Sequence, residues 1–440
     1  MDSTTLFIVG LFLLLACAVL AGELVSRLGQ LPLVGQLIVG VVLGPTVLGP
    51  ALGLQGLPTL FEGIQYLATF FILMAAGLAV SPEQIRATGG SSVLLGVVVF
   101  VVPFLLGAGL VRYLYPGIPL LTSLFVSLAI SITALPVLGL MLREFDLLST
   151  RFGAYLLNGA LVNELLAVTV FAVLLRLLGT HGEVATEVVV SVLSVGLFLS
   201  AVGAVHYLAR ALRAVAAWRL FVRRFWEGWR SREAGFAVLI VAALGAAFLS
   251  QLLGLTFLIG AFYAGLLITP ESAGRATHRA LTQVFDTITW GFFIPLFFAL
   301  VGLSMDLRLL GGSVESLAVF ATLCVFAFGS KVFLGGAVTR ALGWSGEKAL
   351  GGGFLLASRG AVELAMAVIL LSLGVFTPTL FTVVAGVGLV TTFVSPIGAR
   401  PFVRPGPKLP PAPPEPPDPS DLDRSRPLSE GPRSTAPIAR

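Results

Sequence analysis

The chain has 440 residues, of which 57% are hydrophobic and only 11% are charged, and its mean hydropathy is +1.00. Apolar runs of about 20 residues, the length that a helix needs to cross a bilayer, recur as far as residue 398. This composition excludes a soluble globular domain and predicts an all-α polytopic membrane protein. The net charge of +5 is explained by the loops between spans and indicates no nucleic-acid partner.

About thirteen transmembrane helices are expected, and each corresponds to one apolar run of the chain. In chain order they cover residues 5–24, 33–51, 64–80, 91–113, 118–142, 152–178, 187–213, 234–252, 255–269, 283–304, 315–342, 347–373 and 377–398.

Basic residues predict the orientation of this bundle, because short cytoplasmic loops collect Lys and Arg. Alternate loops beginning with the first hold fifteen basic residues, against three in the other set. We therefore expect a cell-membrane protein, in bacteria an inner-membrane one, with its N-terminus outside and its C-terminus in the cytoplasm. The most basic segment, 209–233, carries three tryptophans among its arginines, which favours an interfacial helix. The orientation bias alone also explains its charge.

The transmembrane domain is expected to cover residues 1–400, and a Pro-rich tail covers 401–440. The tail holds 13 of the 26 prolines and few large apolar residues. Such a segment cannot bury a core, so we expect a disordered cytoplasmic extension.

An internal repeat is indicated by three matches at one displacement of 225 residues. Because Gly and Leu are abundant in this chain, any single match is weak. The evidence for a repeat is that separate matches agree on one displacement. Seven spans separate the copies, an odd number, so the second enters from the opposite side. The pattern predicts two inverted five-helix repeats, about 31–178 and 255–398, an architecture in which secondary transporters place a midplane site. The matches are Gly35, Gly40 and Pro45 with Gly260, Gly265 and Pro270, Gly77-Leu78 with Gly302-Leu303, and 131–136 with 356–361.

The third match falls where the fifth and twelfth spans are expected to break. Residues Ser131, Thr133 and Pro136 place two hydroxyls and a proline in the middle of a span. A proline frees backbone carbonyls from helical bonding, and broken helices offer those carbonyls to a cation. A proline kink that serves packing alone is the alternative. Two breaks that are related by the repeat displacement favour an ion-binding site over a kink that serves packing alone.

Two isolated ionisable residues suggest what that site binds. Glu164 stands beside Asn163 in one apolar run, and Lys331 interrupts another; a charge at the bilayer centre costs about 3 kcal/mol on insertion scales. Either a proton or a monovalent cation neutralises Glu164, and the two ligands then exchange across one carboxylate. Lys331 is expected to pair with Glu164 when neither ligand is bound, if the two spans meet. A purely structural ion pair is the alternative.

Three further polar groups are expected near the breaks. Arg359 and Glu363 lie four residues apart and can pair on one helix face, or Arg359 compensates the helix ends. A structural role for this pair is as plausible as a functional one. Asn163 is expected to bond the freed backbone of the crossover, with a spare polar group inside the bundle as the alternative.

The motifs resemble the second family of monovalent cation/proton antiporters, which includes bacterial sodium/proton exchangers, Kef-type potassium systems and plant cation/proton exchangers. The resemblance covers residues 5–398. Its motifs are PLVGQL at 32–37 with LGP at 43–45, ISITALPVL at 130–138 and SRGAVEL at 358–364. It implies a sodium/proton antiporter-like fold, assembled as a homodimer.

The resemblance also implies roles for individual residues. Asn163-Glu164 occupies the position where electrogenic members of the family have Asp-Asp and many other members have Asn-Asp. Lys331 matches the family's membrane-embedded lysine, and Thr133 matches the hydroxyl of its crossover. The chain departs from the pattern in having Glu where Asp is usual, which bears on ion selectivity. The ion- and proton-binding set is then Glu164, Asn163, Thr133 and Ser131, and the charge-compensating set is Lys331, Arg359 and Glu363.

We therefore predict an antiporter that exchanges Na⁺ or K⁺ for H⁺ by alternating access and is electroneutral, because one carboxylate replaces the pair. No phosphate loop, metal-ligand cluster or nucleophile triad is found, so neither an enzyme nor a cofactor is expected. The alternatives are a sodium-coupled organic-solute symporter and a Kef-like gated K⁺ efflux system.

Overall fold

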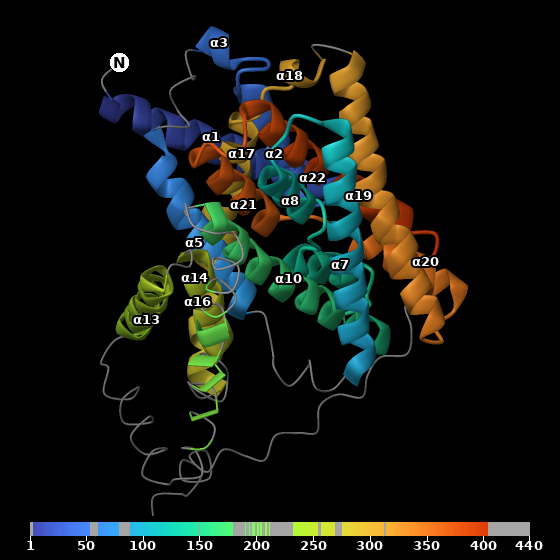
Figure 1. The fold of residues 1–440 in the computed structure, drawn as a ribbon. Coiled ribbons are helices and arrows are strands. Elements are labelled where there is room, and N and C mark those ends of the chain that lie inside the picture. The colour runs from blue at the N-terminus through green and yellow to red at the C-terminus, as the bar shows by residue number, and fades with distance from the viewer. Residues whose placement is uncertain are drawn as a thin grey trace, which may run out of the picture.

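In the residues that it describes, the computed structural model consists of helices joined by turns and short extended segments (Figure 1). Twelve of the thirteen expected spans coincide with described helices. The seventh span lies largely outside the described residues, as do almost all of the basic segment 209–233 and of the tail 401–440. The described residues are 3–52, 60–78, 89–148, 150–178, 232–253, 257–268, 275–311 and 314–403, with scattered residues between 190 and 211.

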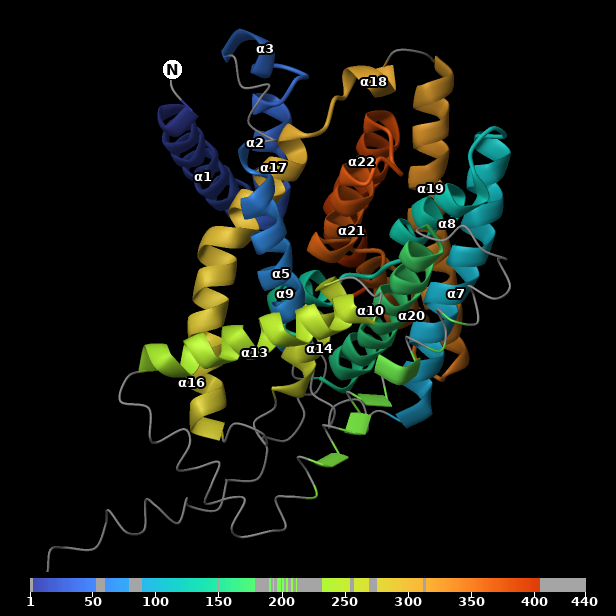
Figure 2. The same cartoon turned by 60° about the vertical axis from the view of Figure 1, so that its left-hand side comes forward.

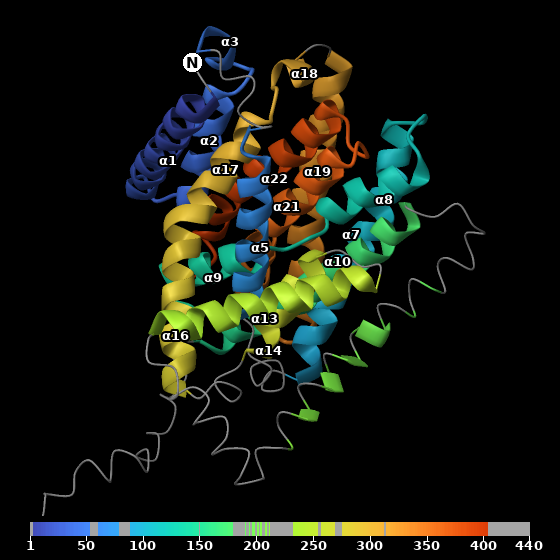
Figure 3. The same ribbon diagram turned by 90° about the vertical axis from the view of Figure 1, so that its left-hand side faces the viewer.

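One group of spans forms what we call the scaffold bundle, on the left of Figure 2. Its last span is long and changes geometry midway: α16 runs through a π-helical turn, η2, into α17 along one edge of the molecule (Figure 3). The sequence analysis expected one uninterrupted span there. The helices are α1 (Ser3–Arg27), α2 (Pro32–Leu43), α5 (Glu62–Leu78), α13 (Arg232–Leu252), α14 (Phe257–Leu267), α16 (Arg275–Ile288), η2 (Thr289–Phe293) and α17 (Ile294–Leu303).

The remaining spans form the site bundle, which lies mostly on the right of Figure 2, with α9 below α5. They are α7 (Gly89–Leu114), α8 (Leu120–Ala129), α9 (Leu135–Glu144), α10 (Arg151–Leu178), α19 (Val314–Ala341), α20 (Gly346–Leu356), α21 (Ala361–Ser372) and α22 (Pro378–Ala399). Two short helices, α3 (Gly49–Leu52) and α18 (Arg308–Gly311), lie at the end of the molecule where α1 begins (Figure 1).

The helices are apolar on their outer as well as their inner faces. Among the described residues, eight helices are long and apolar enough to cross a membrane, and large apolar side chains such as Phe12, Leu105 and Phe333 are exposed. A helix that is apolar all round belongs in a membrane. Lipid tails are as apolar as leucine, so helix association there depends on close packing between small residues.

Glycines supply that packing in two contacts related by the repeat. A Cβ atom at Gly40 of α2 would overlap the carbonyl oxygen of Ala299 in α17, and one at Gly302 would overlap that of Leu37. In the same way, Gly77 of α5 meets the carbonyl of Phe262 in α14, and Gly265 meets that of Met74. The displacement of 225 residues converts Gly40 into Gly265 and Gly77 into Gly302. The two contacts are therefore exchanged by the inverted repeat.

The same correspondence includes one more span in each half. Gly35 packs against the carbonyl of Ala21 in α1, and Gly260 packs against that of Ala246 in α13. Ala21 and Ala246 are again 225 residues apart. The matched packing thus extends from the five expected spans of each repeat to α1 and α13.

The two expected breaks lie side by side in the site bundle. Helix α8 ends at Ala129 and α9 begins at Leu135, while α20 ends at Leu356 and α21 begins at Ala361. The extended segments cross, and the Ala134 amide donates to the Ser358 carbonyl over 3.3 Å. Pro136 lies in the first turn of α9, where its missing N–H costs no helical bond. The crossing leaves carbonyls at the end of α8 and amides at the start of α9 without helical partners.

Candidate ion and proton site

Glu164 of α10 is the carboxylate at the crossing. Its side chain is fully buried, and its Oε2 accepts a hydrogen bond from the Leu135 amide over 3.1 Å. Leu135 is the first residue of α9, and a helix N-terminus favours negative charge. Within the described part of the chain, the other oxygen, Oε1, has no hydrogen-bond partner. Glu164 is therefore held by one oxygen and has the other available for a proton or a cation.

Asn163 holds the backbone of the crossover from the same helix. Its Oδ1 accepts from the Thr133 amide over 2.8 Å, and its Nδ2 donates to the Ser131 carbonyl over 3.4 Å. A neutral amide provides both a donor and an acceptor, which a carboxylate cannot do when ionised. Asn163 thus satisfies one amide and one carbonyl that the break leaves free.

Thr133 links the two broken spans. Its hydroxyl donates to the Leu356 carbonyl at the end of α20 over 2.8 Å, and it accepts from Lys331 over 2.9 Å. Ser131, a member of the expected ion- and proton-binding set, contributes its main chain to the crossover. The Ser131 hydroxyl donates to the Ser127 carbonyl over 2.7 Å, so only its main-chain oxygen faces Asn163 and Lys331.

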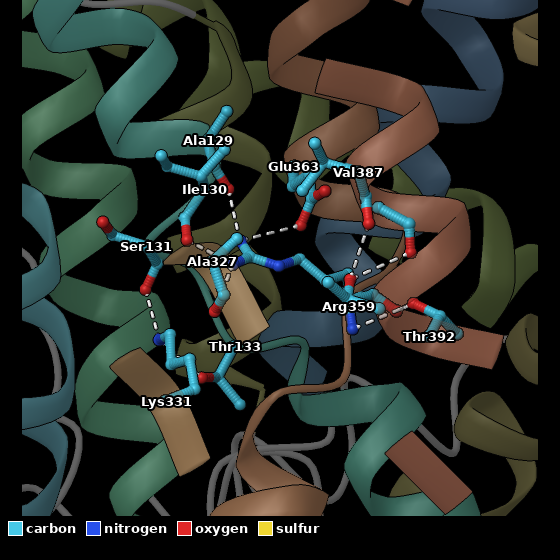
Figure 4. Close-up of polar contacts among 12 residues, drawn as sticks. Ala129, Ile130, Ser131, Thr133, Ala327, Lys331, Arg359, Glu363, Val387 and Thr392 are labelled. Carbon is cyan, nitrogen blue, oxygen red and sulfur yellow. Dashed lines mark hydrogen bonds and ion pairs between the residues drawn. The ribbon is translucent and has the colours of Figure 1, made fainter. Parts of the chain in front are cut away.

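Lys331 of α19 is fully buried and points at the crossover (Figure 4). Its ammonium donates to the Ser131 carbonyl and to the Thr133 hydroxyl. The expected ion pair with Glu164 is not formed among the described residues. Free carbonyls at the end of a helix attract a cation. The crossover therefore takes the place of Glu164 as the partner of Lys331.

Arg359 closes the end of α8 from the second break (Figure 4). Its guanidinium donates to the carbonyls of Ala129, over 2.7 Å, and of Ile130. The expected pair with Glu363 is formed as well, at 3.5 Å between Arg359 Nη1 and Glu363 Oε2, with both side chains 1% exposed. Arg359 therefore performs both suggested roles: it compensates a helix end and pairs with Glu363.

Thr392 of α22 is a site residue that the sequence analysis missed. Its hydroxyl accepts from the Arg359 amide over 3.1 Å and donates to the Arg359 carbonyl over 3.0 Å, so it fixes the backbone from which the guanidinium extends. The available signal was two adjacent threonines, Thr391 and Thr392, in an otherwise apolar run.

The arrangement separates the charges along one broken span. Two cations, Lys331 and Arg359, bind the C-terminal end of α8, and one anion, Glu164, binds the N-terminal end of α9. The side chains of Glu164, Asn163 and Thr133 carry carboxylate, amide and hydroxyl oxygens, the ligand type of hard cations. Among the described residues, His, Cys, Asp and Glu form no group of three or more that could hold a metal ion.

Comparison with known proteins identifies the family. A family model described as "Sodium/hydrogen exchanger, transmembrane" matches residues 11–404. The chain is 28% identical to the Na⁺/H⁺ antiporter NhaS4 of Synechocystis over 92% of this chain and 100% of that protein. It is 25% identical to the Na⁺/H⁺-K⁺ antiporter GerN of Bacillus cereus over 87% of this chain and 93% of that protein.

The fold agrees with a solved structure. The sodium/proton antiporter MjNhaP1 of Methanocaldococcus jannaschii superposes with a TM-score of 0.69 at 14% identity, covering 91% of this chain and 97% of that one. The chain spans about half the length of the plant cation/H⁺ antiporters it matches, 47% of one from Arabidopsis thaliana. The family match, which includes both broken spans and Glu164, shows that the chain belongs to the sodium/hydrogen exchanger family.

Proposed function

We propose that this chain exchanges one monovalent cation, Na⁺ or K⁺, for one proton, and that both ligands bind in turn at Glu164. As a member of the sodium/hydrogen exchanger family, it is a multi-pass monovalent cation/proton antiporter and not an enzyme. The observation that carries the proposal is the position of Glu164: it is fully buried, with one oxygen anchored to the start of α9 and the other unpartnered among the described residues.

Competition for that carboxylate explains obligatory exchange. In a medium of low dielectric an ionised carboxylate is costly, so Glu164 is stable when it carries either a proton or a cation. A site that is empty and charged resists movement through the apolar interior. Only the two neutral forms of the site, with a proton or with a cation bound at Glu164, then move from one face of the membrane to the other. Each movement carries one ligand.

The division into two bundles supplies the moving parts. The site bundle carries Glu164, Lys331 and Arg359, and it meets the scaffold bundle mainly through α21 against α5 and α17, and through α22 against α2. Movement of one bundle against the other around a fixed site is the way in which inverted-repeat transporters alternate access. Glu164 is then exposed first to one face of the membrane and then to the other.

The expected stoichiometry of one cation for one proton follows from the neutral residue that precedes Glu164. Asn163 carries no charge, and Lys331 and Arg359 are bonded to main-chain carbonyls, so one carboxylate charge changes its ligand in each cycle. We therefore expect exchange to be electroneutral. Proteoliposomes clamped at different membrane potentials with valinomycin or a Na⁺-selective ionophore provide the test. The exchange rate should not depend on voltage, and a rate that follows the voltage would show that net charge moves.

Cation-driven proton movement tests the function itself. Proteoliposomes with a preset pH gradient should lose it when Na⁺ or K⁺ is added, and this result would also name the ion. No response to either ion, combined with sodium uptake that depends on an organic solute, would indicate the symporter instead. The cavity beside Arg359 and Glu363, lined also by Leu33 and Phe298, has a volume of about 10 Å³, which is too small for an organic solute.

We also propose a cell-membrane location with the start of α1 outside, and assembly as a homodimer. The basic loops support the orientation, and the family resemblance supports the dimer. Single cysteines placed at exposed loop ends and labelled from one side of the membrane would report the orientation. Chemical cross-linking in membranes would report the dimer.

A further inference from the structure

A second cavity lies between the two bundles, away from Glu164, and has polar side chains in its lining. Its volume is about 220 Å³, enough for several water molecules. The scaffold side consists of Glu62, Gln65 and Tyr66 in the first turns of α5, with Ser304 after the end of α17. The site-bundle side consists of the last two turns of α21 and ends at Ser372. The cavity is therefore at the face of the membrane protein where α5 begins, which is the outer face in the proposed orientation.

The charge in the lining of this cavity favours a positive ion. The described lining residues are Glu62, Gln65, Tyr66, Ser304, Val368, Leu371 and Ser372, among which there are one acid and no base. The Tyr66 hydroxyl lies 3.4 Å from Glu62 Oε1 and 3.1 Å from the Ser372 hydroxyl, so it connects the acid on the scaffold bundle to the site bundle. A carboxylate at the mouth of a cleft with no basic residue in its described lining raises the local concentration of cations.

Gln65 points to an occupant of the cavity. Its side chain lines the cavity yet is only 8% exposed, and within the described part of the chain its Nε2 has no hydrogen-bond partner. A buried polar group without a partner costs about 1–3 kcal/mol. The two ends of an amide exchange by a half-turn of the side chain, so Gln65 can turn its oxygen into the cavity, where it accepts a hydrogen bond from a water molecule that hydrates a cation.

We propose that this cavity is a binding site for a hydrated monovalent cation, with Glu62 supplying the charge and Gln65, Tyr66, Ser304 and Ser372 contacting the hydration shell. A cation there is concentrated at the boundary of the two bundles before it reaches Glu164. The inference rests on the proposed cation/proton exchange and adds a second site to it. Five polar side chains around a wide cavity suit an ion that keeps its water, whereas Glu164 in a closed site suits one that has lost most of it.

Transport measured separately with the cation on the outer and on the inner face of the membrane tests this proposal. The variants either remove or keep one acidic charge. Glu62→Gln removes the charge, Glu62→Asp keeps it, and Glu315→Gln removes an exposed acid in the first turn of α19, on the same face but outside the cavity lining. Cation-driven proton movement is measured in right-side-out and in everted membrane vesicles from a host lacking its own antiporters. The cation is added to the outer face in the first case and to the inner face in the second.

The expected result is specific to one variant and one face. One charge at about 4 Å in water changes affinity by about fivefold, so Glu62→Gln should raise the apparent KM for the outer cation by about fivefold with Vmax unchanged. The inner KM should not change, and Glu62→Asp and Glu315→Gln should resemble the native chain. An unchanged outer KM in Glu62→Gln would overturn the inference, as would an equal rise at both faces or an equal rise in Glu315→Gln. If the native chain shows no cation-driven proton movement, the proposed function fails instead.

Discussion

Lys331 and Asn163 donate to the same atom, the carbonyl oxygen of Ser131. One reaches it from α19 and the other from α10, so the break after α8 is held from two sides. Lys331 is thereby held at the crossover, and Glu164 follows Asn163 on α10. This relationship separates the group that stabilises the break from the group that we propose binds the transported ligand.

Lys331→Gln should therefore weaken the fold more than it weakens exchange. The glutamine retains an NH₂ group but is shorter and loses the charged donor that binds the end of α8, and a buried acceptor left unsatisfied costs about 1–3 kcal/mol. We expect a lower thermal midpoint in detergent, with electroneutral exchange still measurable in proteoliposomes. Lys348→Gln, which removes a partly exposed lysine near Trp344, is the control and should change neither. Full stability with complete loss of exchange would show that Lys331 is itself a ligand-binding group.

Arg359→Lys should destabilise the protein although it conserves the charge. The guanidinium reaches the carbonyls of Ala129 and Ile130 and also Glu363, and the compact ammonium of lysine cannot span three partners. A loss of about 3 kcal/mol is expected for an incompletely partnered buried charge, seen as a lower thermal midpoint. Arg340→Lys provides the comparison, because Arg340 is exposed and makes one bond, to the Trp344 carbonyl. Equal midpoints for the two variants would contradict the role assigned to Arg359.

Thr133→Val should lower the efficiency of exchange. Valine has a similar shape but lacks the hydroxyl that joins Leu356 to Lys331. A buried partner left unsatisfied costs about 1–3 kcal/mol, and a loss in that range lowers kcat/KM by about 5- to 150-fold. Thr133→Ser keeps the hydroxyl and should recover most of the loss. The measurement is the initial rate of proton movement as a function of cation concentration. Equal defects in the valine and serine variants would show that the methyl group matters and the hydroxyl does not.

The glycine contacts give a prediction about the repeat. Gly40→Ala and Gly265→Ala each place a Cβ atom onto a backbone oxygen of the facing helix, which costs about 3 kcal/mol or more because backbones cannot move apart cheaply. Both should lower the thermal midpoint by a similar amount. Gly109→Ala in α7 meets nothing within 4 Å and should be neutral, or stabilising by up to about 1 kcal/mol. A large difference between Gly40→Ala and Gly265→Ala would contradict the equivalence of the two contacts.

Much of this architecture follows from the sequence because membrane helices leave strong signals. Apolar runs locate the spans, and Pro136 and Gly360 mark the two breaks where the structure has them. The π-helical turn at Thr289–Phe293 was not expected, because it inserts one residue into a helical turn without changing the apolar pattern. Its position just before Pro295, which cannot donate a helical hydrogen bond, accounts for it.

The site was predictable in its ionisable residues but not in their partners. Glu164, Lys331 and Arg359 are conspicuous because charge is costly in a span. Their partners are mostly main-chain atoms, such as the carbonyl of Ser131 and the amide of Leu135, and any residue type supplies those. For this reason the sequence suggested a Lys331–Glu164 pair, whereas the structure joins both to the crossover.

The most direct test of the central claim is loss of a preset pH gradient in proteoliposomes when Na⁺ or K⁺ is added, comparing the native chain with Glu164→Gln. Glu144→Gln, a change of a partly exposed acid at the end of α9, is the matched control. Cation-driven proton movement should be retained in Glu144→Gln and abolished in Glu164→Gln, because glutamine cannot exchange a proton for a cation. Undiminished exchange in Glu164→Gln would contradict the account and place the binding carboxylate elsewhere.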